Sequence, residues 1–523
     1  FETREGAVSL DVWNLFRTGE LVAGRVRIVG PELTVVRLAD GRVRLLGQRE
    51  RPADRPPFDL DRLPAGRLEV EDATLHYRDL KTGRGPWTLQ RVRISLRRAH
   101  DAVDMTGEAR LPAELGTRFE FDGKLRGSLD RFVDLVMEVD VRVEQLVLAG
   151  LADLLPEGAG RPLSGSGPVR ASAAFDRGRL GQLRLDLDLS DVAFAVPART
   201  VPPIEALEVA PASRPSGASP LSMPLAEKTL VDRPAAALPR EVRYANLAGK
   251  LRLRQEGDAW VFRANDLRLQ ARGDRGVSAA SLGARWRGHP ASAFAAGASA
   301  TSLDAAAAWP LVLALAPRSF DRWAGLDPSG TIRSLRIDIA RDRAGSEPRF
   351  EVAADVDGLS ARPIGRWPGW RGLTARASGT QERGRIALRA VSPSFEWPRW
   401  FRAPLEAERV EADVDWRRDG GDWVVSSPQL SVQHPKAVAQ GELTLRLPGR
   451  GRSPHLDLDA RVERLDATIV SSVLPIGRLK PRSIAWLEAA FQKGTATAGM
   501  LAYHGPTRKF PFRGGEGEFK ARA

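Results

Sequence analysis

Apolar and polar residues alternate along most of this chain with a period of two. From residue 183 to residue 190 every second position is leucine, and Arg, Asp or Ser stands between the leucines. The same alternation occupies residues 139–144, 442–447 and 456–463. Successive side chains of a β-strand point to opposite faces, so each segment predicts a strand with one apolar face and one polar face.

Short turns separate the predicted strands, which favours an antiparallel meander. Gly30-Pro31 and Asp40-Gly41 punctuate the apolar runs near the start of the chain, and residues 66–127 continue in the same style. Helical candidates are few, so little is left to cover a long apolar sheet face. The predicted fold class is therefore mostly β and mainly antiparallel, and the functional question is what covers the apolar face.

Three short helical segments, each followed or ended by a proline, interrupt the strand pattern at similar intervals. They are residues 146–155, 303–316 and 469–474, and a strand region opened by glycine follows each. This order predicts an internal repeat in which each unit is a short helix plus a broad sheet. The clearest helix covers residues 481–493, with proline in its first turn and glycine after its end.

The sequence lacks the motifs of enzymatic catalysis and of metal binding. It contains no cysteine, and its six histidines stand singly, without the i, i+4 pairing of a zinc site. Ser166 lacks the Gly-x-Ser-x-Gly elbow, and no phosphate-binding or dinucleotide-binding glycine loop is present. We therefore predict that the protein is not an enzyme, has no catalytic residues, and needs neither a metal nor a cofactor.

The formal net charge is +13, but the basic residues are not gathered into a patch. Arginines alternate with Asp and Glu on the same strand faces, as in residues 67–71, which is typical of a solvated mixed-charge surface. No nucleic acid is therefore expected as a partner. The excess of basic residues still favours contact with anionic lipid headgroups.

No window of the sequence approaches the ~20 apolar residues of a membrane span, and no signal peptide is found. The sequence starts at Phe1 and stops at Ala523, directly after a strand-like segment. We therefore expect an excerpt of a longer chain, with any membrane anchor outside it.

Six of the 13 tryptophans fall between residues 367 and 423. Aromatic side chains in such a concentration are able to contact acyl chains or glycans. Ordinary packing within strands is the interpretation that we favour.

Several stretches outside the proline-rich part of the chain follow one another in a recognisable order. The first are Arg67-Leu68-Glu69-Val70-Glu71-Asp72-Ala73 with Tyr77-Arg78-Asp79, Ala109-Arg110-Leu111-Pro112-Ala113-Glu114-Leu115-Gly116, and Leu326-Asp327-Pro328-Ser329-Gly330. The last are Leu474-Pro475, the helix around Trp486-Leu487-Glu488, Gly494, Phe510-Pro511-Phe512 and Gly517-Glu518-Phe519. Together they resemble the YhdP branch of the AsmA-like proteins of Gram-negative envelopes.

The resemblance implies a bridge-like lipid-transfer protein of the periplasm, linked to phospholipid delivery to the outer membrane. It implies phospholipid acyl chains as cargo, the inner membrane as a partner through an anchor absent from this chain, and the outer membrane as a further partner. It also implies an elongated, curved sheet rolled into an open hydrophobic groove. In such a groove, acyl chains would cover the open apolar face, because they need no sequence-specific contacts to fill it.

The repeat and the groove together predict four parts of the chain. Residues 1–145 form a β-groove segment that ends a preceding unit, residues 146–302 and 303–460 form two repeat units, and residues 461–523 begin a further, truncated unit. A run rich in Pro, Ala and Ser at residues 197–240 interrupts the second part. Proline lacks the N–H that a central strand needs, so this run is predicted to be a long loop between two strands.

The alternating apolar positions supply the predicted lining of the groove. These residues are Val139, Val141, Val143, Leu183, Leu185, Leu187, Leu335, Ile337, Leu443, Leu445, Leu456 and Leu458. Two alternatives stay open. One is a non-enzymatic structural or adhesive protein of serial β-sandwich domains, with sealed cores and no lipid; the other is a polysaccharide-acting enzyme on a β-solenoid, for which no carboxylate cluster is found.

Overall fold

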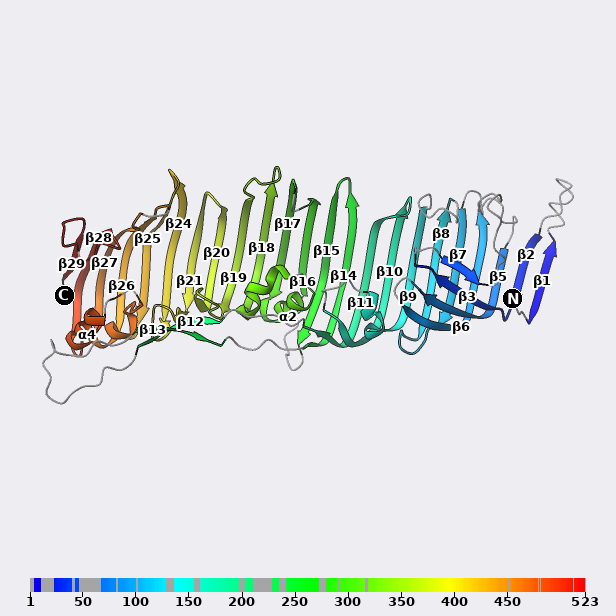
Figure 1. The fold of residues 1–523 in the computed structure, drawn as a ribbon, viewed down its shortest axis with the longest axis horizontal. Coiled ribbons are helices and arrows are strands. Elements are labelled where there is room, and N and C mark those ends of the chain that lie inside the picture. The colour runs from blue at the N-terminus through cyan, green and yellow to red at the C-terminus, as the bar shows by residue number, and fades with distance from the viewer. Residues whose placement is uncertain are drawn as a thin grey trace. The chain divides into compact units, whose positions relative to one another are not determined.

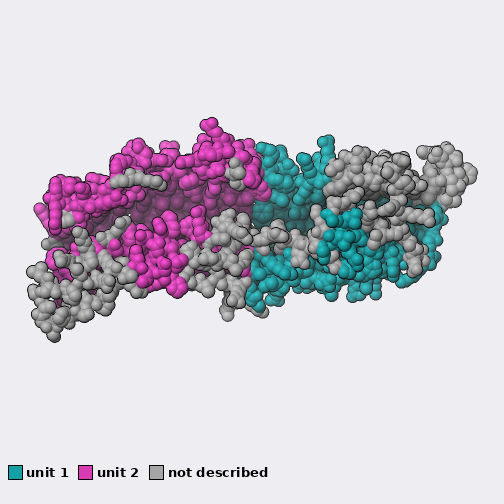
Figure 2. Space-filling view, viewed as in Figure 1, with its two compact units in different colours: residues 1–195, 241–279 teal, residues 196–240, 280–523 magenta. Residues whose placement is uncertain are grey.

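β-strands dominate the computed structural model of the chain (Figure 1). It describes residues 4–10, 23–39, 43–46, 67–80, 83–99, 102–127, 136–154, 160–196, 203–209, 228–234, 241–271, 279–289, 292–315, 318–449, 452–477, 479, 481–510 and 512–522. The chain divides into two compact units, coloured separately in Figure 2. Unit 1 comprises residues 1–195 and 241–279, and unit 2 comprises residues 196–240 and 280–523.

Unit 1 is a sheet in which each strand from β5 onward pairs antiparallel with the next strand of the unit. Its strands are β1 (Glu5–Leu10), β2 (Ala23–Val29), β3 (Glu32–Arg37), β4 (Val43–Leu46), β5 (Arg67–Asp79), β6 (Arg84–Ala99), β7 (Ala102–Arg110), β8 (Arg118–Arg126), β9 (Val136–Val147), β10 (Pro162–Asp176), β11 (Arg179–Ala195), β14 (Glu241–Glu256) and β15 (Ala259–Ala271). The exception is β5, which pairs in parallel with β2 along its first half and with β3 along its second half.

Unit 2 repeats this antiparallel order from β16 to β29. Its strands are β12 (Ile204–Val209), β13 (Lys228–Arg233), β16 (Ala279–Gly288), β17 (Phe294–Asp304), β18 (Ser329–Arg341), β19 (Arg349–Ala361), β20 (Gly369–Thr380), β21 (Arg383–Val391), β22 (Ser394–Glu396), β23 (Leu405–Glu406), β24 (Arg409–Asp419), β25 (Asp422–His434), β26 (Ala437–Leu447), β27 (His455–Asp466), β28 (Thr495–Pro506) and β29 (Glu518–Arg522). No pairing among the described strands joins the two edges of either sheet, so each sheet is open. The predicted mostly β, mainly antiparallel fold class is confirmed.

In each unit, the described helices lie in the connections at one end of that unit's strands (Figure 1). They are η3 (Leu148–Leu154), α2 (Ala305–Leu315), η5 (Arg318–Leu326), η6 (Ala467–Ile469), α3 (Val470–Val473) and α4 (Pro481–Ala490). The predicted helical segments at residues 146–155, 303–316 and 469–474 overlap η3, α2 and the η6–α3 pair. The helix predicted at residues 481–493 starts where α4 starts, but α4 ends earlier, at Ala490. The Asp304 carboxylate accepts a hydrogen bond from the Ala307 N–H (2.8 Å), which caps the start of α2.

The proline-rich run contains structure that the sequence did not predict. Strands β12 and β13 pair with each other inside residues 197–240, while the strands on either side of the run, β11 and β14, are direct neighbours. The run is therefore a connection between two adjacent strands, as predicted, but it carries a hairpin of its own. The two strand segments contain no proline, and proline content averaged over the whole run hid them. The rest of the run, at residues 197–202, 210–227 and 235–240, lies outside the described residues.

Residues with positive φ interrupt many strands close to the ends where the helices lie. They include Gly165, Asp191 and Asp266 in unit 1 and Ser302, Gly330, Gly358, Gly372 and Ala498 in unit 2. Register shifts accompany several of them, for example in the β10–β11 and β19–β20 ladders. Such bulges bend a strand and increase its twist. The strand ends in each unit therefore turn away from the plane of the central strand segments.

Large apolar side chains are sealed mainly at these bent ends. In unit 1 they include Leu115, Leu189, Val192, Phe194 and Leu267, and in unit 2 Leu313, Ile364, Ile469, Ile476 and Ile484. Unit 1 has two further buried clusters toward its start, one around Val103 and Leu125 and one around Ala73 and Val92. Along the central segments of β16 to β28, most apolar residues larger than alanine stay partly exposed. The sheet face in unit 2 is thus not the principal sealed core.

Candidate functional site

Three neighbouring cross-strand rows in unit 1 bring together the predicted lining residues of β9 and β11. The central row runs through Phe121, Val141, Ala171, Leu185, Leu251 and Ala264. On one side of it, Val139 and Leu183 face each other across Ala173, and on the other side Val143 and Leu187 face each other across Val169. Residues of one row share a sheet face, so all six predictions for unit 1 fall on one apolar face.

A longer row in unit 2 contains three of the predicted residues. It runs through Ala284, Ala298, Ile337, Val352, Gly379, Gly384, Trp416, Val425, Leu445, Leu456 and Gly505, one residue from each successive main strand. The remaining predictions lie in the adjacent rows. Leu335 pairs with Ala300 and Ala354, and Leu443 pairs with Leu458.

These rows are neither sealed nor fully open to solvent. Val143 is buried, with 8% of its surface exposed, and the other eleven predicted lining residues are half-buried. Figure 2 shows the surface of unit 2 hollowed between the hairpin turns at one end of its strands and the elements at the other end. An apolar face that is recessed but still accessible is suited to a hydrocarbon ligand.

The opposite face of the sheet is covered by ion pairs between neighbouring strands. In unit 1 the Glu108 carboxylate accepts hydrogen bonds from Arg118 (2.6 Å) and Arg93 (2.7 Å), and these bonds lower its pKa. In unit 2 hydrogen bonds from Thr374 and Arg333 lower the pKa of Asp357. Carboxylates whose charged form is stabilised in this way are poorly suited to acid–base catalysis near neutral pH.

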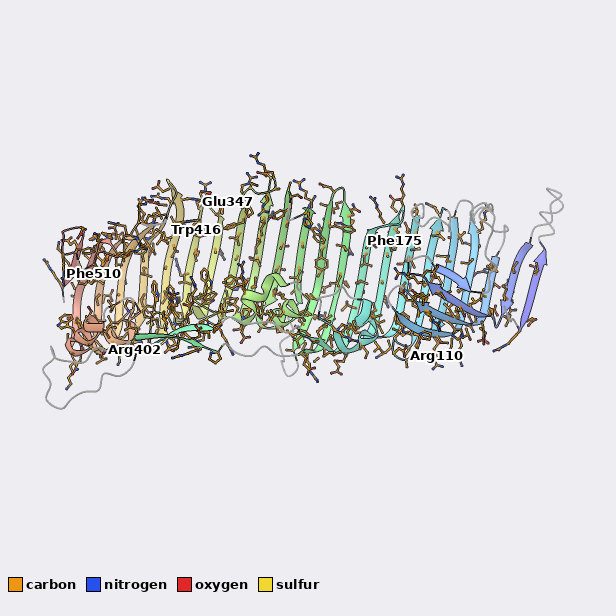
Figure 3. The ribbon with its side chains drawn as sticks, in the orientation of Figure 1. Arg110, Phe175, Glu347, Arg402, Trp416 and Phe510 are labelled. Atoms are coloured by element: carbon orange, nitrogen blue, oxygen red, sulfur yellow. The ribbon has the colours of Figure 1, made fainter. Side chains whose placement is uncertain are left out.

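Trp416 lies across two glycines of the long row in unit 2. A Cβ atom added at Gly384 would lie 2.1 Å from Cζ2 of Trp416, and one added at Gly379 would lie 2.6 Å from the same atom. The indole Nε1 donates a hydrogen bond to the Thr380 carbonyl oxygen (3.2 Å). The ring therefore fills the space that two absent side chains leave, toward the hairpin-turn ends of the strands (Figure 3). Sequence reasoning missed this arrangement, because its signal is a pair of glycines that become neighbours only once the strand register is known.

An aromatic cluster covers the same face near the last strands of unit 2. Tyr503 pairs with Leu458 in the sheet, and its ring lies 5.2–6.3 Å from the rings of Phe510, Phe512 and Phe519. Burial among these rings raises the pKa of the Tyr503 hydroxyl. The turn between β28 and β29 therefore folds onto the apolar face, and its aromatic residues cover that face.

The part of the chain that the structure describes contains no group of three or more His, Asp or Glu side chains arranged to hold a metal ion. Within that part, no helix is long and apolar enough to cross a membrane.

Comparison with known proteins identifies the family of the chain. The model of the YhdP protein family matches residues 1–523, the whole sequence. The chain belongs to the YhdP family. The resemblance inferred from the sequence is thereby confirmed.

One curated relative within the YhdP family is the intermembrane phospholipid transporter YhdP of Escherichia coli strain K12. It is 26% identical to this chain over 211 residues, which make up 40% of this chain and 16% of the relative. The match therefore spans only about one sixth of the relative's length. No solved structure is significantly similar to the chain.

Proposed function

We propose that this chain is part of a lipid-transfer protein that carries phospholipid acyl chains along its apolar rows. The observation that carries the proposal is the half-exposed apolar face: rows of apolar side chains, interrupted in unit 2 by glycines, continue across successive strands, and most of their larger side chains are not sealed. Membership of the YhdP family and the name of the E. coli relative support phospholipid as the cargo.

Hydrophobic contact between an acyl chain and the rows suits movement along the rows better than tight binding at one position. Moving one CH₂ group from water to an apolar surface gains about 0.8 kcal/mol, so an acyl chain gains on the order of 10 kcal/mol. The contact is non-directional, because hydrocarbon makes no hydrogen bonds that must be broken when it moves along a row. Similar side chains in successive strands therefore hold an acyl chain without fixing its position.

The twelve predicted residues are the proposed lining, and the charged face opposite them is the proposed solvent face. Leu185 illustrates the division in unit 1: its own row is apolar, while its neighbours in sequence are Arg184 and Asp186. The four predicted parts of the chain remain a proposal of the same kind. In that proposal, each repeat adds further rows to the conduit.

We extend the proposal to the setting of the protein. The full-length protein works in the periplasm, is anchored in the inner membrane by a segment outside this chain, and delivers phospholipid toward the outer membrane. We propose that this transfer involves no enzymatic chemistry. The carboxylates Glu108 and Asp357 on the polar face support this, because hydrogen bonds from neighbouring side chains hold them in their charged form.

The rival protein of serial β-sandwiches finds less support. A sandwich needs two facing sheets around each core. In each unit the main described strands form a single ladder instead, and the separate β12–β13 hairpin is too small to face it.

A pair of neighbouring substitutions on β26 tests the function. Leu445 lies in the apolar row, whereas Thr444 lies on the opposite face, where its cross-strand neighbours are Ser426 and Asp457. In the full-length protein purified without detergent, Leu445→Lys should lower co-purified phospholipid severalfold, measured by extraction and mass spectrometry. Thr444→Lys should leave the phospholipid content unchanged.

Circular dichroism of both variants should match the wild type, because a half-exposed position tolerates the long lysine side chain. Wild-type protein that carries no phospholipid, or a Leu445→Lys variant that carries as much as the wild type, would refute the function.

A further inference from the structure

The turn between β28 and β29 brings a phenylalanine onto the end of the long apolar row. The row passes through Leu456, and its last residue in the ladder is Gly505. A Cβ atom added at Gly505 would lie 2.9 Å from Cε1 of Phe512, and one added at Gly517 would lie 2.8 Å from the same atom. Phe512 is 8% exposed. A ring that belongs to the turn, and not to the sheet, therefore closes the row at Gly505.

The backbone of Phe512 is strained. Its φ is +61°, in the left-handed region that bulky residues rarely adopt. Such a conformation persists only where its surroundings hold it, and it is typical of switch segments. Here the Phe512 N–H donates to the Lys509 carbonyl oxygen (2.8 Å), and the ring packs edge-on against Tyr503 with 5.2 Å between centroids. Withdrawal of the ring would therefore release the strain, which favours a turn that is able to move.

Hydrogen bonds attach the turn to a neighbouring segment at its base. The N–H groups of Thr507 and Arg508 donate to the Pro454 carbonyl oxygen (2.8 Å) and to the Ser453 hydroxyl (3.1 Å). Beyond these two residues, the hydrogen bonds in the described part of the turn stay within the turn or reach the end of β28. The aromatic rings therefore supply the contacts between the tip of the turn and the apolar face, so the tip is able to lift while the base stays in place.

The aromatic cover of the row through Tyr503 is not a sealed core. Phe510 is 43% exposed and Phe519 is 49% exposed, with ring centroids 5.8 and 6.3 Å from that of Tyr503. Water therefore reaches both of these rings. Because hydrophobic contact is non-directional, an acyl chain is able to replace a ring on the row.

We propose that the turn between β28 and β29 is an autoinhibitory gate on the apolar rows. Without an acyl chain, the Phe512 ring covers the end of the long row. An acyl chain that advances along the row displaces the ring and lifts the tip of the turn. This inference rests on the proposed function, because it concerns the regulation of the same rows.

Hydrogen–deuterium exchange in the full-length protein tests the gate without any substitution. The N–H groups of Phe512 and Gly515 donate hydrogen bonds within the turn, so their exchange reports on its opening. Protein stripped of lipid should exchange them slowly, and protein loaded from vesicles of dioleoylphosphatidylcholine should exchange them severalfold faster. Glycerophosphocholine, the same headgroup without acyl chains, should leave their exchange unchanged.

The turn between β18 and β19 is the matched control. It contains no aromatic residue, and its Ser346 N–H donates to the Arg343 carbonyl oxygen (3.3 Å). Its exchange should be the same with and without lipid. Exchange at Phe512 and Gly515 that is unchanged or slower on loading would overturn the gate. Acceleration of equal size in the control turn, or with glycerophosphocholine, would overturn it as well.

Two neighbouring substitutions separate the ring from the backbone of the turn. Phe512→Gly removes the ring and the strain, because glycine adopts positive φ freely. With a benzophenone amino acid at Phe519, on the strand after Gly505, this variant should capture severalfold more phospholipid than the wild type. Arg513→Gly also places a glycine in the turn but keeps the ring, and Arg513 is exposed, so its capture should equal that of the wild type. Equal capture by the two variants would contradict the gate.

The outcomes separate the gate from the proposed function. Co-purified phospholipid that is lost in Leu445→Lys, together with unchanged exchange of the turn, would refute only the gate. Wild-type protein without phospholipid would refute the proposed function and the gate with it. If Phe512→Gly does not fold, the exchange measurement on the wild type still decides.

Discussion

At the scale of single residues, two glycines and one tryptophan ring shape the apolar face of unit 2. Gly379 and Gly384 leave space in the long row, and the Trp416 ring occupies it. Aromatic rings stabilise glycines in neighbouring strands by covering the exposed backbone. The consequence is an even wall where two missing side chains would otherwise leave a recess.

Gly384→Ala should disturb this packing. The new methyl group would meet the Trp416 ring at 2.1 Å and the Ser378 carbonyl oxygen at 2.6 Å, so the ring must move. Overpacking of this kind typically costs about 1–3 kcal/mol. The expected result is a lower melting temperature and a changed near-ultraviolet circular dichroism signal. Gly449→Ala, where no atom lies within 4 Å of the added carbon, should change neither.

A second prediction at this scale concerns Glu108 on the polar face and the pH dependence of stability. Arg118 and Arg93 hold its pKa below the ordinary value of 4.5, so its contribution to stability is present above pH 4.5 and is lost as the pH falls through the lowered pKa. Glu108→Gln should therefore lower the melting temperature above pH 4.5, and the difference from the wild type should shrink below that pH. Glu114→Gln offers the control, because Glu114 is exposed and forms no ion pair with a described residue. A difference independent of pH would contradict the role of the carboxylate charge.

At the scale of elements, the bulges separate the open face from the sealed strand ends. In β11 the alternation of Leu183 to Leu189 stops at Asp191, whose φ is +51°, and the three residues after it are all buried. Asp tolerates this conformation better than most residues, whereas a β-branched side chain does not. One strand thus supplies both a lining segment and a core segment.

Substitutions at Asp191 test the importance of this bend. Asp191→Gly should keep or raise the melting temperature, because glycine adopts positive φ without strain. Asp191→Val should lower stability by about 1–2 kcal/mol. Equal melting temperatures for the two variants would show that the backbone at this position is free to change.

The elements show how far sequence reasoning reaches in this protein. The period-two pattern and the proline and glycine signals predicted the strands and the positions of η3, α2 and α4, because these signals are local. The cross-strand partners of Leu185 or Leu445 were not predicted, because register depends on bulges and turns along the whole ladder. The hairpin β12–β13 was missed because proline content was read over the whole run.

At the scale of the whole chain, membership of the YhdP family and the half-exposed apolar rows are independent observations, and both support the proposal of lipid contact. The YhdP family match covers the full sequence, while the apolar rows follow from the strand pairing within each unit. Both units carry a polar face of paired charges and an apolar face of half-buried residues. We therefore expect both units to contact lipid, not one alone.

Photo-crosslinking tests this expectation. A benzophenone amino acid placed at Leu185 in unit 1 or at Leu445 in unit 2 should capture phospholipid in cells that produce the full-length protein. The same amino acid at Arg184 or Thr444, each the preceding residue on the opposite face, should capture little. Capture from only one unit, or equal capture from both faces, would contradict a lining shared by the two units.

The pairing of nearly every main strand with its neighbour in sequence has a consequence for how such proteins change over time. A hairpin inserted into, or deleted from, either ladder keeps the direction of all later strands and returns the chain to the same edge. Each such event would alter the ladder by two strand spacings, roughly 10 Å, and leave the inward and outward positions of the flanking strands intact. The length of each ladder is therefore adjustable in steps of one hairpin, without redesign of any individual strand.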